Sequence, residues 1–190
     1  VSNVMDEIGN TILPSSQFGF DFIQQMTVSF QDGLSPTPAY DGTSDSYIRE
    51  ATATTNYGLA TTLQVDGDEP SGAGTDMSIV LGWDISEIPV TATVDAASIH
   101  LNTLNVGGPY GCFALLRAWN QAEVTWGQAA SGSAWGSPGA TAGSDRDSLS
   151  VCTVNAGSLG PLTVNLNNDG LALVQGWVDG TILNNGLVIA

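Results

Sequence analysis

Two short acidic turns carry residue types that could bind a metal ion. One runs from Asp41 to Asp45 through Gly, Thr and Ser, and the other contains Asp66, Asp68 and Glu69. Carboxylate oxygens on glycine-containing loops, together with backbone carbonyls, are the ligands that Ca²⁺ takes in proteins. Neither turn has the ligand spacing of an EF-hand, so a structural Ca²⁺ site and a pair of solvated acidic turns both remain open.

Aromatic side chains in predicted turns could bind sugars. Such sites stack the apolar face of a sugar on Trp or Tyr and place polar groups at its hydroxyls. The candidate stacking residues in turns are Tyr40, Tyr57, Tyr110 and Trp135. The same residue types also fill hydrophobic cores, and we expect a core position for Trp83, Trp119 and Trp177, which lie in strand or helix patterns.

The sequence offers little that indicates catalysis. His100 is the single histidine and lies in a predicted strand, and no Gly-x-Ser-x-Gly motif marks a nucleophilic serine. A glycosidase or lyase would need two carboxylates paired in a cleft. The glutamates at 50, 69, 87 and 123 each lie in a turn or at a strand end, as solvated residues do. We therefore predict a protein that is not an enzyme and has no cofactor other than the possible Ca²⁺.

The charge balance excludes several classes of partner. There are 19 Asp and Glu residues, three Arg and no Lys, which gives a net charge of -16. Nucleic acids and anionic membrane surfaces need clustered Lys and Arg, so neither is an expected partner. No apolar run approaches the ~20 residues that span a bilayer, which also argues against membrane insertion. An anionic polysaccharide would be repelled unless Ca²⁺ bridged it or the Arg residues lay nearby.

Two cysteines, Cys112 and Cys152, each lie inside an apolar, strand-like run. One histidine and no Cys-x-x-Cys motif cannot assemble a zinc site. We predict one disulfide that joins two strands, and two buried free thiols are the alternative. A disulfide indicates an oxidising compartment, so we expect the protein outside the cell or on its surface.

The elements that position these residues are those of an all-β protein. Short strand-like runs alternate with Asp, Gly and Pro turns, which favours an antiparallel β-sandwich over a fold of alternating strands and helices. Strands are predicted at 26–30, 46–51, 61–65, 77–83, 97–103, 111–119, 148–154, 162–166 and 187–190. One helix is predicted over 169–179, and 127–147 is predicted to be a long loop. We divide the chain into an N-terminal extension, 1–25, and a sandwich domain, 26–190.

Several short motifs occur in the order found in a known family. They include Asp45-Ser-Tyr-Ile-Arg, Leu81-Gly-Trp-Asp-Ile-Ser-Glu-Ile-Pro, Leu116-Arg-Ala-Trp-Asn-Gln and Asn185-Gly-Leu-Val-Ile-Ala. Their succession over about 27–190 resembles the DNRLRE-type domain, a β-sandwich of large extracellular proteins that is similar to carbohydrate-binding modules. The resemblance implies a jelly-roll-like fold, secretion, and a non-catalytic role in polysaccharide binding or cell-surface architecture.

The sequence departs from that family at its two ends. Family members usually continue past the equivalent of Gly186 into one more strand, whereas this sequence stops at Ala190. An apolar segment in the N-terminal extension could supply a strand instead, to a neighbouring copy or to its own sandwich. The residues proposed for this contact are Val4, Ile8, Ile12, Leu13, Phe18, Phe20 and Phe22.

Two functional hypotheses follow from these observations. The first is an extracellular structural subunit that self-assembles into filaments or surface arrays by donor-strand complementation, with copies of itself as partners. The alternative is a polysaccharide-binding module of a secreted or cell-surface protein. The fold analogy alone is weak evidence for either function, because one fold carries many functions.

Overall fold

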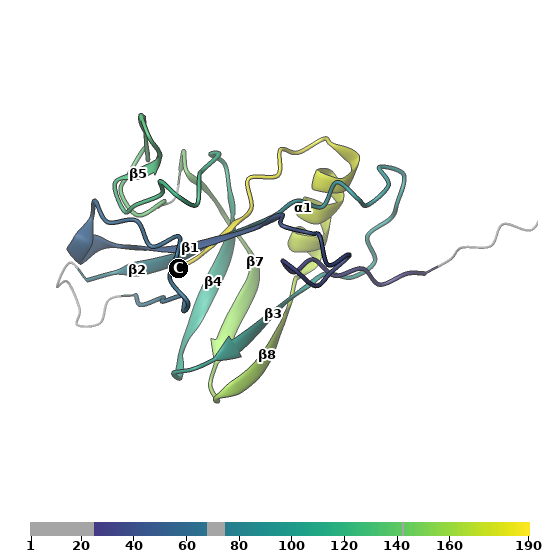
Figure 1. Cartoon of the computed structure of the whole chain (residues 1–190), viewed down its shortest axis with the longest axis horizontal. Coiled ribbons are helices and arrows are strands. Elements are labelled where there is room, and N and C mark those ends of the chain that lie inside the picture. Colours follow the sequence, from purple (N-terminus) through teal and green to yellow (C-terminus); the bar gives the residue numbers. More distant parts are fainter. Residues whose placement is uncertain (1–24, 68–74, 142) are drawn as a thin grey trace, which may run out of the picture.

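The chain folds as an antiparallel β-sandwich with one short helix, as predicted (Figure 1). The computed structural model describes residues 25–67, 75–141 and 143–190. The largest sheet has five strands in the order β1-β2-β9-β4-β7. Their bounds are Thr43–Arg49 for β1, Met77–Trp83 for β2, Leu187–Ile189 for β9, Gly107–Leu115 for β4 and Arg146–Ala156 for β7.

Smaller elements cover this five-stranded sheet. Strands β3 (Ser98–Thr103) and β8 (Gly160–Asn165) form an antiparallel pair, and β5 (Gln128–Ala130) and β6 (Ser133–Ala134) form another. A 3-10 turn at Glu50–Thr52 follows β1. Helix α1 (Asn168–Asp179) follows β8 and is too short and too polar to cross a membrane, as is any other described helix.

Both faces of the five-stranded sheet are buried. On one face, the paired residues Ile79, Ile189 and Cys112 pack in a first core with β3, β8 and α1. On the other face, the cross-strand neighbours Val80 and Val188 pack in a second core under the segment 116–145. Strands buried on both faces need apolar residues at successive positions, which explains the uninterrupted apolar runs in β2 and β9.

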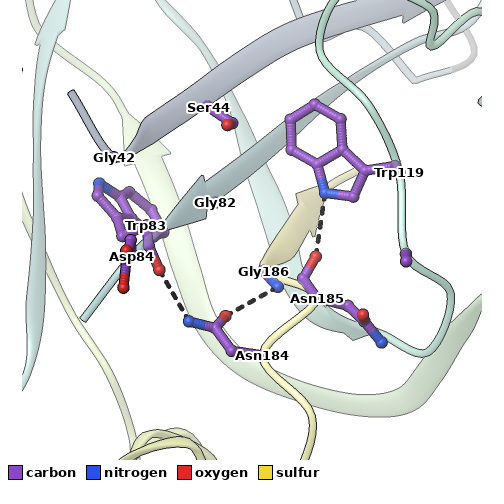
Figure 2. A pocket seen from close by; sticks show the side chains of 10 residues that line it. Gly42, Ser44, Gly82, Trp83, Asp84, Trp119, Asn184, Asn185 and Gly186 are labelled. Atoms are coloured by element: carbon purple, nitrogen blue, oxygen red, sulfur yellow. Dashed lines mark hydrogen bonds between the residues drawn. The ribbon is translucent and has the colours of Figure 1, made fainter. Parts of the chain in front are cut away.

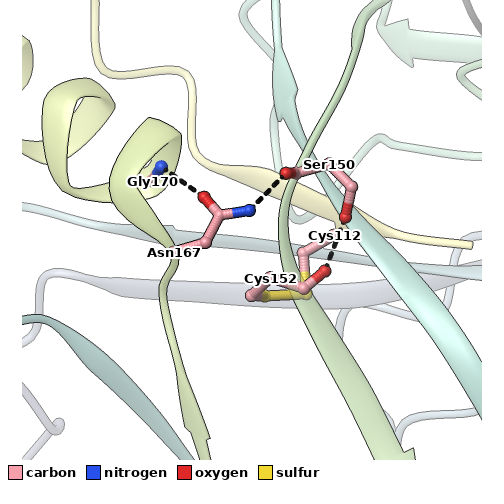
Figure 3. Close-up of a disulfide and its surroundings, with 5 residues drawn as sticks. All are labelled: Cys112, Ser150, Cys152, Asn167 and Gly170. Carbon is pink, nitrogen blue, oxygen red and sulfur yellow. Dashed lines mark hydrogen bonds between the residues drawn. A yellow bond between two sulfur atoms is a disulfide. The ribbon is translucent and has the colours of Figure 1, made fainter.

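The predicted disulfide is confirmed. Cys112 of β4 and Cys152 of β7 lie directly opposite each other, with their Cα atoms 5.0 Å apart, and both are buried (Figure 3). The bond therefore staples two neighbouring strands inside the first core. In the same view, Asn167 joins the start of α1 to β7: its Nδ2 donates to the Ser150 carbonyl at 2.7 Å.

Helix α1 also agrees with the prediction and has clear end signals. The side chain of Asn167 accepts a hydrogen bond from the Gly170 N–H at 2.9 Å, which satisfies one of the free donors of the first turn. Gly180 ends the helix with a φ of 75°, a left-handed conformation that glycine adopts without strain. The predicted helix, 169–179, begins one residue later than the observed one.

Some predicted elements differ from the structure. Residues 61–65 do not form a strand, and an isolated bridge between Asp66 and Met77 follows them. Residues 26–30 are not a strand either, since Met26 is 77% exposed and has no partner strand. The predicted loop 127–147 contains the β5–β6 hairpin. The proposed assembly residues, Val4 to Phe22, lie outside the described residues.

Candidate functional site

A cleft opens at one end of the five-stranded sheet. Its first hollow has a volume of about 390 Å³ and is lined by Trp83, Trp119 and the turn Asn184–Gly186, among others (Figure 2). A second hollow of about 260 Å³ is lined by Tyr40, Asp41 and Glu87. The two hollows share Gly42 and Asp84 as lining residues, so they adjoin. We call this pair of hollows the sheet-end cleft.

The strand register explains why these residues meet. Thr43, the first residue of β1, pairs with Trp83, the last residue of β2. Leu187, the first residue of β9, pairs with Leu81, so the turn before β9 lies at the same end of the sheet. Segments far apart in sequence therefore converge on one cleft, where loops can supply binding groups without disturbing the sheet.

Trp119 forms one wall of the first hollow. Its side chain is partly buried against the second core, and its indole N–H donates to the Asn185 carbonyl at 3.0 Å (Figure 2). The ring lies near the backbone of Gly82, where a Cβ atom would be 3.6 Å from the indole. The absence of a side chain at Gly82 thus leaves space next to the indole.

The turn before β9 presents an amide side chain to the cleft. Asn184 is exposed, donates from Nδ2 to the Trp83 carbonyl at 2.8 Å, and accepts from the Gly186 N–H at 3.2 Å. Its amide group retains further donor and acceptor capacity for a ligand. Gly186 has a φ of 77°, and a Cβ there would collide with the Leu81 carbonyl, so this turn requires glycine.

Tyr40 lines the second hollow. Its hydroxyl donates to the Asp84 carbonyl at 3.0 Å, and its ring contacts Phe30 with centroids 5.6 Å apart. Burial raises the pKa of the Tyr40 hydroxyl, and the negative charges of Asp32 and Asp84 raise it further. The phenol is therefore a neutral, fixed group at the cleft.

The cleft is acidic. Asp41, Asp84 and Glu87 line it, and its described lining residues include no Lys, Arg or His. Hydrogen bonds from the side chain and the backbone N–H of Ser86 lower the pKa of Asp84, so this carboxylate is charged at neutral pH. Nearby, burial and the charge of Asp32 raise the pKa of Asp45.

A buried carboxylate holds the segment that carries Trp119. Asp145 is fully buried and accepts hydrogen bonds from Arg117 Nε at 3.0 Å, from the Gly136 N–H at 2.8 Å and from the Ser137 N–H at 2.9 Å. Burial on its own raises the pKa of Asp145, but these donors outweigh it and lower the pKa overall. The network ties Arg117, just before Trp119, to the far end of the segment at Asp145.

The structure describes three of the five predicted metal ligands. Asp41 lines the second hollow, Asp45 lies on β1, and Asp66 forms the bridge to Met77. Within the described ranges, no group of three or more His, Cys, Asp or Glu side chains is placed to hold a metal ion. Asp68 and Glu69 lie outside the described residues, so the Ca²⁺ site remains a prediction.

The predicted stacking residues have different positions. Tyr40 lines the cleft, whereas Tyr57 stacks on Tyr47 with centroids 4.2 Å apart and Tyr110 packs against the first core. Trp135 is only 5% exposed, and its indole N–H donates to the Thr125 carbonyl at 2.9 Å. This burial corrects the expectation of a surface platform at Trp135, because a core side chain offers no face to a sugar.

Core positions are predicted for Trp83, Trp119 and Trp177, and all three pack against one of the two cores; what the sequence did not indicate is that Trp83 and Trp119 also line the cleft. Both are only partly buried, and both line the first hollow. The available signal was their position: each ends a predicted strand and is followed by polar residues. His100 is exposed on β3 between the Ser98 and Thr163 hydroxyls and is not a lining residue.

The model of carbohydrate-binding module family 96 matches residues 37–145, which is more than half of the chain. The matched region includes Tyr40, Trp83 and Trp119 of the cleft. No curated protein matches the sequence significantly. The match agrees with the expected similarity to carbohydrate-binding modules, while the narrower DNRLRE-type resemblance stays a prediction. On this evidence, the chain belongs to carbohydrate-binding module family 96.

Proposed function

We propose that this protein binds a polysaccharide in the sheet-end cleft and does so without catalysing a reaction. The observation that carries the proposal is the joint presence of Trp83, Trp119 and Tyr40 in two adjoining hollows with an exposed amide at Asn184. Carbohydrate-binding module families are non-catalytic in general. An aromatic wall supplies apolar contact with a sugar face, and the amide meets its hydroxyl groups.

The site suits a chain of sugars better than one ring. The first hollow alone, at about 390 Å³, lies in the volume range of ordinary ligand pockets. The second hollow adjoins it and adds another aromatic side chain, Tyr40. We propose that neighbouring sugars of one polysaccharide occupy the two hollows. The disulfide agrees with an extracellular place of action.

Binding can be tested with two variants that act in different ways. Trp119→Ala removes the wall, and Gly82→Val fills the space beside the indole with a residue that suits a strand. Each should weaken binding about tenfold or more, which corresponds to about 1.4 kcal/mol. Trp126→Ala is the control, because Trp126 packs against the second core and does not line the cleft.

The measurement is affinity electrophoresis against a panel of neutral, cationic and anionic polysaccharides, followed by calorimetry on the polymer that retards the protein. Thermal unfolding of each variant shows whether it is folded. Adding Ca²⁺ or a chelator tests the Ca²⁺ proposal in the same gels. The binding proposal fails if the unmodified protein is retarded by no polysaccharide in either condition, or if Trp126→Ala weakens binding as much as Trp119→Ala.

Self-assembly is a second candidate, favoured by one observation on the small sheet. In the part of the chain that the structure describes, β3 pairs with β8 alone, so the outer edge of each strand lacks a partner strand. Gln25 Nε2 donates to Asp95 Oδ2 at 3.2 Å, close to the start of β3. We propose that the extension adds a strand at this edge in a neighbouring copy. If a chain without residues 1–25 forms the same oligomers as the full chain, this candidate fails.

A further inference from the structure

The outer edges of the sheets differ in how far other groups already engage them. At the edge of β1, the Asp45 N–H donates to Gln121 Oε1 at 3.1 Å. At the edge of β7, the Asn167 N–H, just before α1, donates to the Val151 carbonyl at 2.9 Å. In the part of the chain that the structure describes, β3 and β8 pair only with each other (Figure 1). The edges of this pair are therefore the ones to compare.

The register of the β3–β8 pair decides which backbone groups point outward. The Leu166 N–H donates to the Ala97 carbonyl at 3.0 Å, so Ala97 and every second residue after it direct their backbone groups toward β8. The N–H and C=O groups of Ser98, His100 and Asn102 consequently point away from β8. All three side chains are exposed. The outer edge of β3 thus presents a regular row of donors and acceptors.

The outer edge of β8 is a poorer place for another strand to add. By the same alternation, residues 161, 163 and 165 direct their backbone groups outward. The first of these is Pro161, which has no N–H and cannot donate to a neighbouring strand. Strand β3 has no proline, Lys, Asp or Glu, the residues that usually protect a strand edge from pairing. Of the two edges, that of β3 is therefore the open one.

This edge lies in a part of the chain that carries no carboxylate. Although 19 of the 190 residues are acidic, none occurs in the stretches 96–122 and 148–168, which together make up about a quarter of the chain. The first stretch contains β3 and the second contains β8. Two copies that each carry a net charge of -16 repel each other, so they approach most easily where neither presents a carboxylate. Interface cores are depleted of charged residues in the same way.

From these observations we infer that a second copy of this chain docks at the β3 edge. The two β3 strands run antiparallel about a two-fold axis at His100, so that Ser98 faces the partner's Asn102. In this register all three outward residues of each strand exchange backbone hydrogen bonds, and the contact is self-complementary, as two-fold symmetry requires. The dimer carries two sheet-end clefts, which can hold one polysaccharide at two points. The pairing itself does not depend on polysaccharide binding.

The expected dimer is weak, because each copy contributes only one six-residue strand. Analytical ultracentrifugation from about 1 µM to about 1 mM should show a monomer–dimer equilibrium. His100→Glu places two carboxylates directly opposite each other, whereas His100→Gln has nearly the same shape as the Glu variant and no charge. The dissociation constant of the Glu variant should be at least about tenfold higher than that of the Gln variant. The control is Gln64→Glu, which adds the same charge at an exposed residue outside β3 and should leave the equilibrium unchanged.

Cross-linking tests the register. Opposite Cα atoms in a hydrogen-bonded antiparallel pair lie about 5.5 Å apart, which a disulfide can span. His100→Cys should therefore give a covalent dimer when glutathione disulfide is added. Ser98→Cys should not, because the two substituted positions lie four residues out of register, about 14 Å apart. The native cysteines are already bonded to each other, so they do not take part.

Several results would overturn the inference. They are an unmodified protein that stays monomeric over the whole range, equal association of the Glu and Gln variants, a Gln64→Glu control that weakens the dimer as much, and equal cross-linking of both cysteine variants. A chain without residues 1–25 separates this pairing from the donor-strand candidate. Dimers that persist without the extension support the β3 pairing. Dimers lost with the extension, together with no cross-link in His100→Cys, give the edge to the extension instead.

Discussion

Replacing Asp145 by Asn should destabilise the whole module, although the two side chains have nearly the same shape. The carboxylate is fully buried and accepts three hydrogen bonds, one of them from Arg117. Its Oδ1 accepts from Arg117 and Gly136, and its Oδ2 accepts from Ser137. An asparagine that keeps the first two bonds turns its NH₂ group toward the Ser137 N–H, so two donors face each other and neither is satisfied.

The magnitude follows from the number and type of bonds lost. Breaking a buried charged network by removing one partner typically costs about 3–5 kcal/mol. In a protein of this size each kcal/mol lowers the melting temperature by about 2–4 °C, so a fall of about 10 °C is expected. Urea unfolding gives the free energy, and Asp147→Asn is the control because Asp147 bonds mainly to its own turn. The control should stay within about 0.5 kcal/mol of the unmodified protein.

The same carboxylate makes stability depend on pH in a defined direction. Its folded pKa is lowered, so it lies below the unfolded value of about 3.9. The stabilisation is therefore complete above about pH 3.9 and is lost as the pH falls through the folded pKa. Asp145→Asn should flatten the stability profile in this acidic range. A variant that loses less than about 1 kcal/mol, or keeps the unmodified acid profile, would refute the reasoning.

Two further predictions concern the frame around the cleft. Reducing the bond between Cys112 and Cys152, which are 40 residues apart, should lower the free energy of unfolding by about 4 kcal/mol by the loop-entropy relation. Urea unfolding with and without reductant measures this loss, and equal midpoints would contradict the prediction. Gly186→Ala should destabilise the protein by more than about 2 kcal/mol, because the new Cβ atom meets the Leu81 carbonyl. Gly180→Ala is also at positive φ but has open space around it, so it should destabilise the protein by only about 1 kcal/mol. Thermal unfolding of the two variants tests this difference. Similar losses of stability would contradict it and would show that the positive φ alone sets the cost of the substitution.

Much of the fold could be predicted because local patterns carried it. The apolar runs of β2 and β4, the predicted range of α1 and the positions of the cysteines all agree with the structure. The stretch 61–65 was misread because alternating residues indicate one buried face but cannot show whether a partner strand is present. Its apolar residues Leu63 and Val65 do pack against the first core, without a strand partner.

The candidate site was harder to predict, because it depends on how distant segments meet. Trp135 lies in a Gly- and Ser-rich stretch and so resembled a loop residue, yet the segment 116–145 folds over the second face of the sheet and buries it. Trp83 and Trp119 pack against the cores, as their strand patterns predicted, but these patterns could not show that both side chains also line a cleft. The register that sets the end of β2 beside the start of β9 brings Trp83 to the cleft, and the segment after β4 brings Trp119 there.

The position of β9 has a consequence for how the chain acquires its structure. Strand β9 lies between β2 and β4, so the β1–β2 pair and the disulfide-linked β4–β7 pair belong to one sheet only through Leu187–Ile189. During synthesis, the two pairs of strands cannot join into one sheet until these three residues have been made. Long-range closure of this kind is slow, and it leaves the inner edges of β2 and β4 open until late. The five-stranded sheet is therefore completed only when β9, the last of its strands in sequence, takes its place between β2 and β4.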